Sequence, residues 1–508
     1  MGMLKASKFP PIGVFSALLL LLLLARVWVF YYLNLQYIDS DQPLMWRGAF
    51  DYSHGQFNEP RYFGQNYNTL LEGLFAAPLL WAGVKVYVAV PLVTHVLFLF
   101  PFLFSAFYLY AKQMRAQAIL LLAMVVCMPV EFDMLSSLPR GFVTGLFFCS
   151  FFIVSLLQPK HLLWLHVNAA LGVIAFFVNQ NSILVSAPIA LYLFLENYRS
   201  PKFYSVLVTV VLTYVAMYFL LDRYYVTHQG AALVKMRVVF SINDLLDSLA
   251  HLDDRFVHIS YFATGKSITI FLVVALLLLA SWQQKRNLFY ALLAFLFIIV
   301  LSFSFQKNIE GCTWPFYSFS RSYLGIPLLL GLFATQVQWH LRYSNWLVII
   351  PFLFGAYKLN TVQSVVEEHV QHNYYIVVYK LDYALEAIEV YKKRCAEAKV
   401  SDFFISKRFW LNSILVYGGP AVDPDFPTTL EVEDDRRHWL MQQYSEKTVT
   451  RFMLVAGSNE FHTSVYNADS AFKITPIDGY GLYLIEDNTL KTKDFLKRFK
   501  DVEFRKQL

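Results

Sequence analysis

The sequence predicts a polytopic α-helical membrane protein with about 11 transmembrane helices, followed by a C-terminal soluble α/β domain. Of its 508 residues, 57% are hydrophobic and only 15% are charged, whereas soluble domains carry about 25% charged residues. Aromatic residues reach 18%, which suits lipid-facing and interfacial positions. Long apolar runs stop near residue 360. The chain therefore divides into a transmembrane domain, 1–360, and a second domain, 361–508.

Each expected span is an apolar run that approaches the roughly 20 residues needed to cross a bilayer. The first run, 11–33, is too long for the core of a signal peptide, and no small-residue cleavage site follows it. We therefore expect it to remain in the mature protein. The other expected spans cover 86–110, 117–133, 141–157, 162–179, 183–196, 204–221, 267–282, 288–305, 324–339 and 346–359.

Lysine and arginine residues gather in alternate connections between these spans, which the positive-inside rule assigns to the cytoplasm. An odd number of spans places the long connections, 34–85, 222–266 and 306–323, on the other side with the C-terminal domain. We expect an integral, multi-pass protein of a bacterial inner membrane whose working face and C-terminal domain are periplasmic; a protein of the endoplasmic reticulum would obey the same charge rule. The basic residues concerned are Lys5, Lys8, Lys112, Arg115, Lys160, Arg199, Lys202, Lys285, Arg286 and Arg342.

The C-terminal domain has the mixed pattern of an α/β module. Residues Tyr374 to Val400 predict a long helix. Turns are expected at 418–420 and 478–481, where glycines cluster. Short strands are predicted at 402–406, 451–457, 472–477 and 481–486.

Two carboxylates, Asp39 and Asp41, follow the first span where the chain leaves the bilayer. A membrane fold has no structural need for acidic groups there, but a reaction at the membrane surface can use a carboxylate as a general base. The loop continues into an apolar piece, 69–81, which is too short to span. It suits a helix lying at the interface.

The first loop resembles that of the GT-C superfamily of membrane glycosyltransferases, and most closely the group of protein O-mannosyltransferases and lipid A aminoarabinose transferases. In that group an Asp-Glu pair follows the first span, and a Gly, a Pro, a Gly and a Tyr come before an amphipathic helix. The chain departs from this pattern where Gln42 replaces the Glu and where no Lys follows the Tyr. The matching positions here are Asp41, Gln42, Gly55, Pro60, Gly64 and Tyr67.

Two further segments are similar to family motifs. Residues 177–182, Phe-Val-Asn-Gln-Asn-Ser, stand where many relatives have Thr-Lys-Gly, and residues 320–327 are similar to an Arg-Tyr-Leu-Leu-Pro run that begins a late span. The resemblance implies transfer of a sugar from a polyprenyl-phosphate donor to a cell-envelope glycan, lipid or protein acceptor. It implies membrane lipids as partners and no nucleic acid.

The resemblance assigns the general base to Asp41, which aligns with the family Asp, and Asp39 is the competing assignment. The alternative without chemistry is that Asp39 caps a short helix and Asp41 is solvated. Asp-Ser-Asp also resembles the metal-binding Asp-x-Asp of other glycosyltransferases, so a divalent metal, Mg or Mn, is a further use of the pair.

Other charged residues of the outer loops are candidates for a second acid or for the donor phosphate. Glu131 and Asp133 are the second acidic candidates, with a cap and a nearby ion pair as the alternative. Arginine suits the phosphate because its planar fork binds it bidentately. The remaining cations would be solvated or would anchor the interface. The phosphate candidates are Arg61, Arg140, Lys235, Arg237, Arg255, His258, Lys266, Arg321 and Tyr323.

Cys127 and Cys149 lie in apolar runs, whereas Cys312 and Cys395 both fall on the expected outer side and could pair. Three other functions stay open: an oligosaccharide ligase or polymerase with a diphosphate-linked donor, a lipid-glycan transporter or flippase, and a non-catalytic membrane subunit. A transporter predicts inverted repeats, and the sequence contains no convincing repeat.

Overall fold

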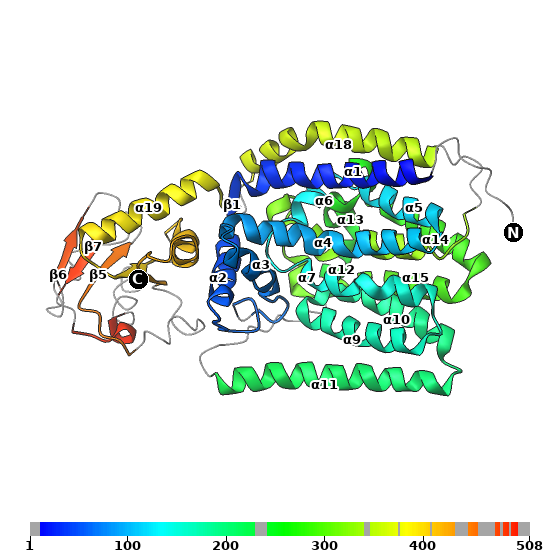
Figure 1. The fold of residues 1–508 in the computed structure, drawn as a ribbon, viewed down its shortest axis with the longest axis horizontal. Helices are drawn as coiled ribbons and strands as arrows, with labels where there is room; N and C mark the ends of the chain where they lie inside the picture. Colours follow the sequence, from blue (N-terminus) through cyan, green and yellow to red (C-terminus); the bar gives the residue numbers. More distant parts are fainter. Residues whose placement is uncertain are drawn as a thin grey trace.

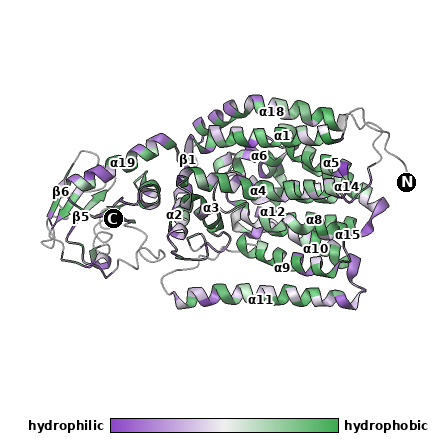
Figure 2. Ribbon diagram, viewed as in Figure 1, coloured by the Kyte–Doolittle hydropathy of each residue, from purple (hydrophilic) through white to green (hydrophobic). Residues whose placement is uncertain are grey.

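The computed structural model describes residues 11–63, 65–228, 241–339, 346–373, 376–406, 409–431, 446–455, 473–477, 481–486 and 489–495. A bundle of apolar helices forms one end of the molecule and a smaller module with a β-sheet forms the other (Figure 1). Hydrophobic residues predominate in the bundle, whereas the module is mixed (Figure 2).

The first half of the bundle is built from ten helical segments. They are α1 (Pro11–Val29), η1 (Phe30–Asn34), α4 (Val86–Ala111), α5 (Arg115–Val126), α6 (Val130–Leu135), α7 (Thr144–Phe147), η2 (Phe148–Phe151), α8 (Phe152–Leu157), α9 (Leu162–Val178) and η3 (Gln180–Ser182).

The second half closes the bundle, with α18 packed along α1 (Figure 1). Its segments are α10 (Ile183–Asn197), η4 (Pro201–Phe203), α11 (Tyr204–Thr227), α12 (Ile242–Ala250), α13 (Leu252–Phe256), η5 (Val257–Ile259), η6 (Tyr261–Ala263), α14 (Ile268–Gln284), α15 (Arg286–Ser302), α16 (Gln306–Ile309), η7 (Pro315–Tyr317), η8 (Phe319–Tyr323), α17 (Ile326–Ala334) and α18 (Trp346–Gln371).

Three helices within the described residues are long and apolar enough to cross a membrane: Pro11–Asn34, Val86–Ala111 and Pro201–Thr227. Most of the other expected spans contain apolar helices of 10–17 residues, so the predicted number of spans is not established. Two expected spans are interrupted. Pro129 starts the separate helix α6 inside the third, because proline disrupts a helix interior and suits its first turn. A 3₁₀ segment, η2, interrupts the fourth.

The first long loop, 34–85, is more ordered than its sequence suggests. It contains a short strand, β1 (Tyr37–Asp39), and two helices, α2 (Gln42–Ser53) and α3 (Leu71–Trp81). Helix α3 was predicted, and α2 corresponds to the short helix of the alternative in which Asp39 is a cap. Helices α2 and α3 pack closely at Gly73, where an added Cβ would lie 2.8 Å from the backbone nitrogen of Ala49. A glycine is therefore needed for this contact.

The C-terminal module contains a five-stranded sheet in the order β4-β3-β5-β7-β6. Strand β3 is parallel to β4 and β5, while β7 is antiparallel to β5 and β6. Four of these strands were predicted, and β4 was not. The bounds are β3 (Asp402–Ile405), β4 (Thr428–Glu431), β5 (Arg451–Val455), β6 (Lys473–Pro476) and β7 (Leu482–Glu486), with helices α19 (Leu381–Glu397), η9 (Ile414–Gly418) and α20 (Gly419–Val422).

Three predictions about this region need correction. Helix α18 continues to Gln371, so the bundle ends later than the boundary expected at residue 361. The predicted helix 374–400 begins only at Leu381, because β2 (Val378–Lys380) precedes it. The predicted turn at 418–420 is helical, since η9 and α20 meet there. The turn predicted at 478–481 falls mostly outside the described residues.

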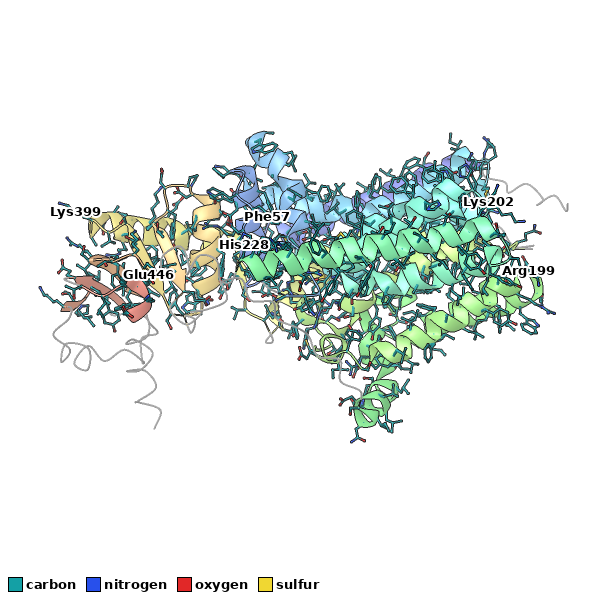
Figure 3. All side chains as sticks on the ribbon, turned by 90° about the horizontal axis from the view of Figure 1, so that it is seen from below. Phe57, Arg199, Lys202, His228, Lys399 and Glu446 are labelled. Carbon is teal, nitrogen blue, oxygen red and sulfur yellow. The ribbon has the colours of Figure 1, made fainter. Side chains whose placement is uncertain are left out.

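The module is joined to the first loop by strand pairing and by a shared core. Strands β1 and β2 form a two-stranded antiparallel sheet. The rings of Phe63 and Tyr417 lie 5.2 Å apart, and Gly418 faces Pro43 and Trp46 of α2. The acidic loop and the module therefore lie at the same end of the bundle. Arg199 and Lys202 lie at the opposite end, far from Lys399 and Glu446 of the module (Figure 3).

Candidate active site

Asp39 is the last residue of β1, and its carboxylate is held by the chain around it. The side chain is fully buried. Its Oδ1 accepts hydrogen bonds from the backbone N–H groups of Asp41 (2.9 Å) and Gln42 (3.2 Å), and its Oδ2 accepts one from Gln42 Nε2 (2.8 Å). Gln42 is the first residue of α2, so Asp39 caps that helix. This geometry agrees with the non-catalytic alternative for Asp39, in which its side chain caps a short helix.

Arg140 lies between the two carboxylates of the motif. Its Nη2 is 2.6 Å from Asp39 Oδ2, and its Nε is 3.7 Å from Asp41 Oδ2. The guanidinium also donates to the backbone carbonyl of Phe316. Burial disfavours the charged form of Arg140, but Asp39 and then Asp41 more than offset this effect, and the pKa of Arg140 is raised. Arg140 is thus a stable cation fixed beside the carboxylates of Asp39 and Asp41.

Asp41 differs from Asp39 in its exposure. Its side chain is 46% exposed, whereas that of Asp39 is not exposed. The backbone carbonyl of Asp41 accepts a 2.7 Å hydrogen bond from the hydroxyl of Tyr62. Burial, with a further contribution from Asp41, raises the pKa of Tyr62, so this hydroxyl keeps its proton. Asp41 is therefore fixed through its backbone and presents its carboxylate to solvent.

This arrangement does not fit a divalent metal held between Asp39 and Asp41. The guanidinium of Arg140 contacts both carboxylates, and the oxygens of Asp39 already accept three hydrogen bonds. Within the described residues, no group of three or more His, Cys, Asp or Glu side chains could hold a metal ion. The chemistry of Asp41 is therefore derived below without a metal.

Arg321 supplies a second buried cation near the motif. It donates to the carbonyls of Tyr317 (2.9 Å), Ser318 (2.9 Å) and Glu310 (2.8 Å). Its guanidinium lies 4.1 Å from the centroid of the Tyr317 ring. Burial lowers its pKa, and the charge of Arg140 acts in the same direction. Arg140 and Arg321 thus hold neighbouring carbonyls of one segment, 310–318.

Tyr67 connects this second cation with the motif. Burial raises the pKa of Tyr67, and both Arg321 and Asp41 act on its hydroxyl electrostatically. The structure thus gathers Asp41, Arg140, Tyr67 and Arg321, which come from the first loop and from two distant parts of the chain.

A chain of amides links the segment 177–182 to Arg140. Asn179 caps η3 by accepting a 3.0 Å hydrogen bond from the N–H of Asn181. Its Nδ2 donates to Asn68 Oδ1 (2.6 Å), and Asn68 Nδ2 donates to the carbonyl of Arg140 (3.0 Å). Asn68 was not a candidate from the sequence, because nothing in its local pattern separates it from an ordinary loop residue.

The second acidic candidates occupy other surroundings. Asp133 is buried and pairs with Arg26 at 3.0 Å and with Lys358, so it joins α6 to α1 and α18. Glu131 lies 3.3 Å from Nε2 of His369. Neither residue is paired with Arg140 in the described part of the chain: Asp133 is held in a buried ion pair, and Glu131 lies against a histidine.

Two of the remaining phosphate candidates, Arg255 and His258, lie near Arg321, because the backbone of each is hydrogen-bonded to Ser320. Arg255 donates to the carbonyls of Asn308 and Ile309. His258 binds the carbonyl of Thr313 (2.7 Å), and burial, together with His369, lowers its pKa to about 4. Lys266 is exposed and pairs with Asp253 at 3.0 Å. Tyr323 is buried against Ser302.

Arg61 contacts the carbonyl of Phe177 and lines a cavity described below. Lys235 and Arg237 lie outside the described residues. All four cysteines are free, so the pairing of Cys312 with Cys395 does not occur.

No protein-family model matches this sequence, and no curated protein matches it. Among solved structures, the chain is similar to ArnT from Cupriavidus metallidurans in the apo state, with a TM-score of 0.53, 10% identity, and coverage of 93% of this chain and 98% of that one. ArnT from the same organism bound to undecaprenyl phosphate gives a TM-score of 0.47 at 10% identity, with coverage of 92% and 98%. The similarity to the apo structure shows that this chain has an ArnT-like fold.

Proposed function

We propose that this protein is a membrane glycosyltransferase of the GT-C type, which moves a sugar from a polyprenyl-phosphate donor to a cell-envelope glycan, lipid or protein acceptor. The reaction takes place at the non-cytoplasmic face, on the side of the C-terminal module, in a bacterial inner membrane. One observation carries the proposal: the half-exposed carboxylate of Asp41 lies beside a buried, ion-paired arginine, Arg140, at the start of α2. The ArnT-like fold supports it.

The two aspartates then have separate roles. Asp41 accepts the proton of an acceptor hydroxyl while the acceptor oxygen forms a bond to the anomeric carbon of the sugar. The bond from that carbon to the donor phosphate breaks, and its electron pair leaves with the phosphate. Asp39 takes no part in bond making. It holds Arg140 and caps α2, and so fixes the position of Asp41.

The leaving phosphate gains negative charge in the transition state, which favours preorganised cations close to it. Arg140 and Arg321 are buried and bound to the protein, so they need no reorganisation when this charge develops. Tyr67 adds a protonated hydroxyl in the same region. These three groups are the phosphate-binding set that the geometry favours.

The test compares Asp41→Asn with Asp39→Asn in the purified, full-length protein. Asp41→Asn removes the base and should lower turnover by roughly 10²–10⁴-fold while thermal stability stays near that of the wild type, because the side chain is half exposed. Asp39→Asn breaks a buried ion pair, which costs about 3–5 kcal/mol, so its main effect should be a lower melting temperature. Asp253→Asn, at a similarly exposed outer-loop carboxylate, is the control and should keep full turnover.

The donor in this assay separates the proposal from its rivals. Transfer from a lipid monophosphate sugar supports it, whereas transfer from a diphosphate-linked glycan alone identifies a ligase or polymerase. A transporter or a non-catalytic subunit forms no glycoside in the purified assay. If Asp41→Asn retains wild-type turnover, Asp41 is not the base.

A further inference from the structure

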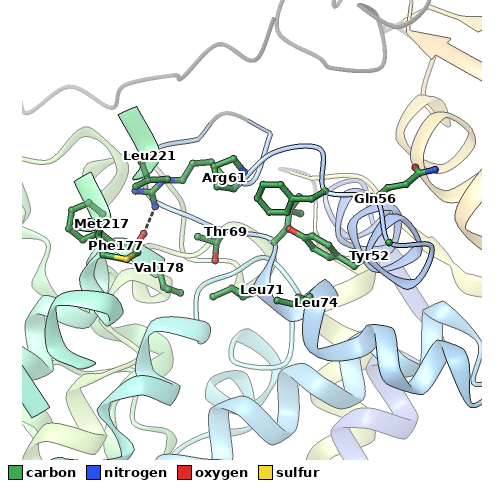
Figure 4. A pocket seen from close by; sticks show the side chains of 14 residues that line it. Tyr52, Gln56, Arg61, Thr69, Leu71, Leu74, Phe177, Val178, Met217 and Leu221 are labelled. Atoms are coloured by element: carbon green, nitrogen blue, oxygen red, sulfur yellow. Dashed lines mark hydrogen bonds between the residues drawn. The ribbon is translucent and has the colours of Figure 1, made fainter. Parts of the chain in front are cut away.

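A cavity of about 430 Å³ lies behind the first loop, between α3, α9 and α11 (Figure 4). Most of its wall is apolar and includes Leu74, Phe177, Met217 and Leu221. Its size falls within the range of roughly 300–1,000 Å³ that is usual for small-molecule sites. The lining thus suits a hydrocarbon chain.

One cation breaks this apolar lining. Arg61 is 6% exposed, and its guanidinium reaches across to the carbonyl of Phe177 (Figure 4). Its Nε has no hydrogen-bond partner among the described residues, and none of the ion pairs formed within that part of the chain involves Arg61. A buried cation without a counter-ion is costly, so this guanidinium would be stabilised by an anion from outside the protein.

Neither Asp39 nor Asp41 lines the cavity. The neighbouring residues Tyr62 and Arg61 make contacts in different directions: Tyr62 bonds to the carbonyl of Asp41 and Arg61 to that of Phe177. Of these two residues, Arg61 lines the cavity and Tyr62 does not.

The outer wall of the cavity is a helix at the edge of the bundle. Helix α11 contacts α9 and extends beyond it at the edge of the bundle (Figure 1), and only 6% of its apolar stretch is buried within the protein. Tyr225 at its end is tied to the first loop by a 3.3 Å hydrogen bond to Glu59. The remaining faces of α11 are apolar and exposed, as in Leu212 and Phe219, so lipid chains can reach this side of the bundle.

We infer that the cavity binds a lipid with an anionic head group, which pairs with Arg61 while one hydrocarbon chain lies along Leu74, Phe177, Met217 and Leu221. The inference rests on the proposed function only in taking the chain to be embedded in a membrane. A phosphate on a polyprenyl chain and the phosphodiester of an acidic phospholipid share this chemistry.

Native mass spectrometry of the purified full-length protein in a neutral detergent tests the site. The lipids are a polyprenyl monophosphate, phosphatidylglycerol and zwitterionic phosphatidylcholine. Arg61→Gln should weaken binding of at least one of the two anionic lipids by about 10–100-fold, the effect of losing a charged hydrogen bond, and should leave phosphatidylcholine unchanged. Arg199→Gln, an exposed arginine at the opposite end of the bundle, is the control and should bind as the wild type does.

The lipid whose binding Arg61→Gln weakens identifies the occupant of the cavity. Weaker binding of the polyprenyl monophosphate alone identifies the carrier lipid. Weaker binding of phosphatidylglycerol as well identifies a membrane phospholipid. Met217→Trp fills the cavity and should reduce anionic-lipid binding even if Arg61→Gln fails to fold. Lipid binding is measured here without turnover, so a failed proposal for catalysis leaves this result intact. Binding of both anionic lipids within twofold of the wild type in folded Arg61→Gln, or in Met217→Trp, overturns the inference.

Discussion

Asp39 and Val378 face each other across a two-stranded antiparallel sheet, which joins the acidic motif to the strand that leads into the C-terminal module. The backbone N–H of Leu381 extends this pairing with a 2.8 Å hydrogen bond to the carbonyl of Gln36. The strand that ends in Asp39 is therefore fixed from both sides, by η1 before it and by the module beside it. The module helps to set the position of the candidate base.

This pairing predicts a specific cross-link. Tyr37 and Lys380 are register partners, and partners in an antiparallel pair lie about 4.5–5.5 Å apart at Cα, within the range that a disulfide accepts. Tyr37→Cys with Lys380→Cys should therefore oxidise to a disulfide, detected by mass spectrometry of the linked peptides. Tyr37→Cys with Val378→Cys is two residues out of register and should not form the bond. Equal yields for the two pairs would show that the module does not dock in this register.

Substitutions in the buried cluster of Arg26, Asp133 and Lys358 should change the stability of the protein by unequal amounts. It holds two cations and one carboxylate, all buried. Asp133→Asn leaves both cations uncompensated and should lower the free energy of unfolding by about 3–5 kcal/mol. Lys358→Met leaves a balanced pair of Arg26 and Asp133 and should cost less. Thermal unfolding in detergent checks the order, and a larger loss for Lys358→Met would contradict it.

The buried carboxyl group of Glu72 should make the free energy of unfolding depend on pH. It is fully buried on α3, where its Oε1 accepts bonds from the N–H of Gly141 (3.2 Å) and the hydroxyl of Thr144 (3.3 Å). Burial raises its pKa from 4.5 to about 8. Between these values the folded protein keeps a proton that the unfolded chain loses, so stability falls as pH rises through this window, by at most about 1.4 kcal/mol per pH unit.

Glu72→Gln removes this titration and should flatten the decrease in melting temperature between pH 5 and about 8. Glu389→Gln, at an exposed position on α19, is the control and should keep the slope of the wild type. An unchanged slope in Glu72→Gln would show that Glu72 is ionised throughout this range.

Local pattern accounts for the features that the sequence predicts well. Helices α1, α4 and α11 follow from long apolar runs, and α3 follows from an apolar piece too short to span. Strands β3, β5, β6 and β7 follow from short runs bounded by turn residues. Each of these signals depends on residues close together in the chain. The sequence likewise predicts that Asp39 and Asp41 follow the first span, because this depends only on one apolar run and the residues directly after it.

Long-range contacts account for the rest. In the sequence only the family resemblance separates Asp41 from Asp39. Their different exposure arises because the N-terminus of α2 and Arg140 enclose Asp39, whereas Asp41 lies beside the same arginine and stays 46% exposed. No local sequence pattern predicts the interaction of Asn68 with Asn179. The same holds for the pairing of β1 with a strand more than 300 residues later. The sequence alone therefore predicts where the helices and the acidic pair lie. The packed structure determines which carboxylate is structural and which faces solvent, because burial and ion pairing depend on groups that are distant in the chain.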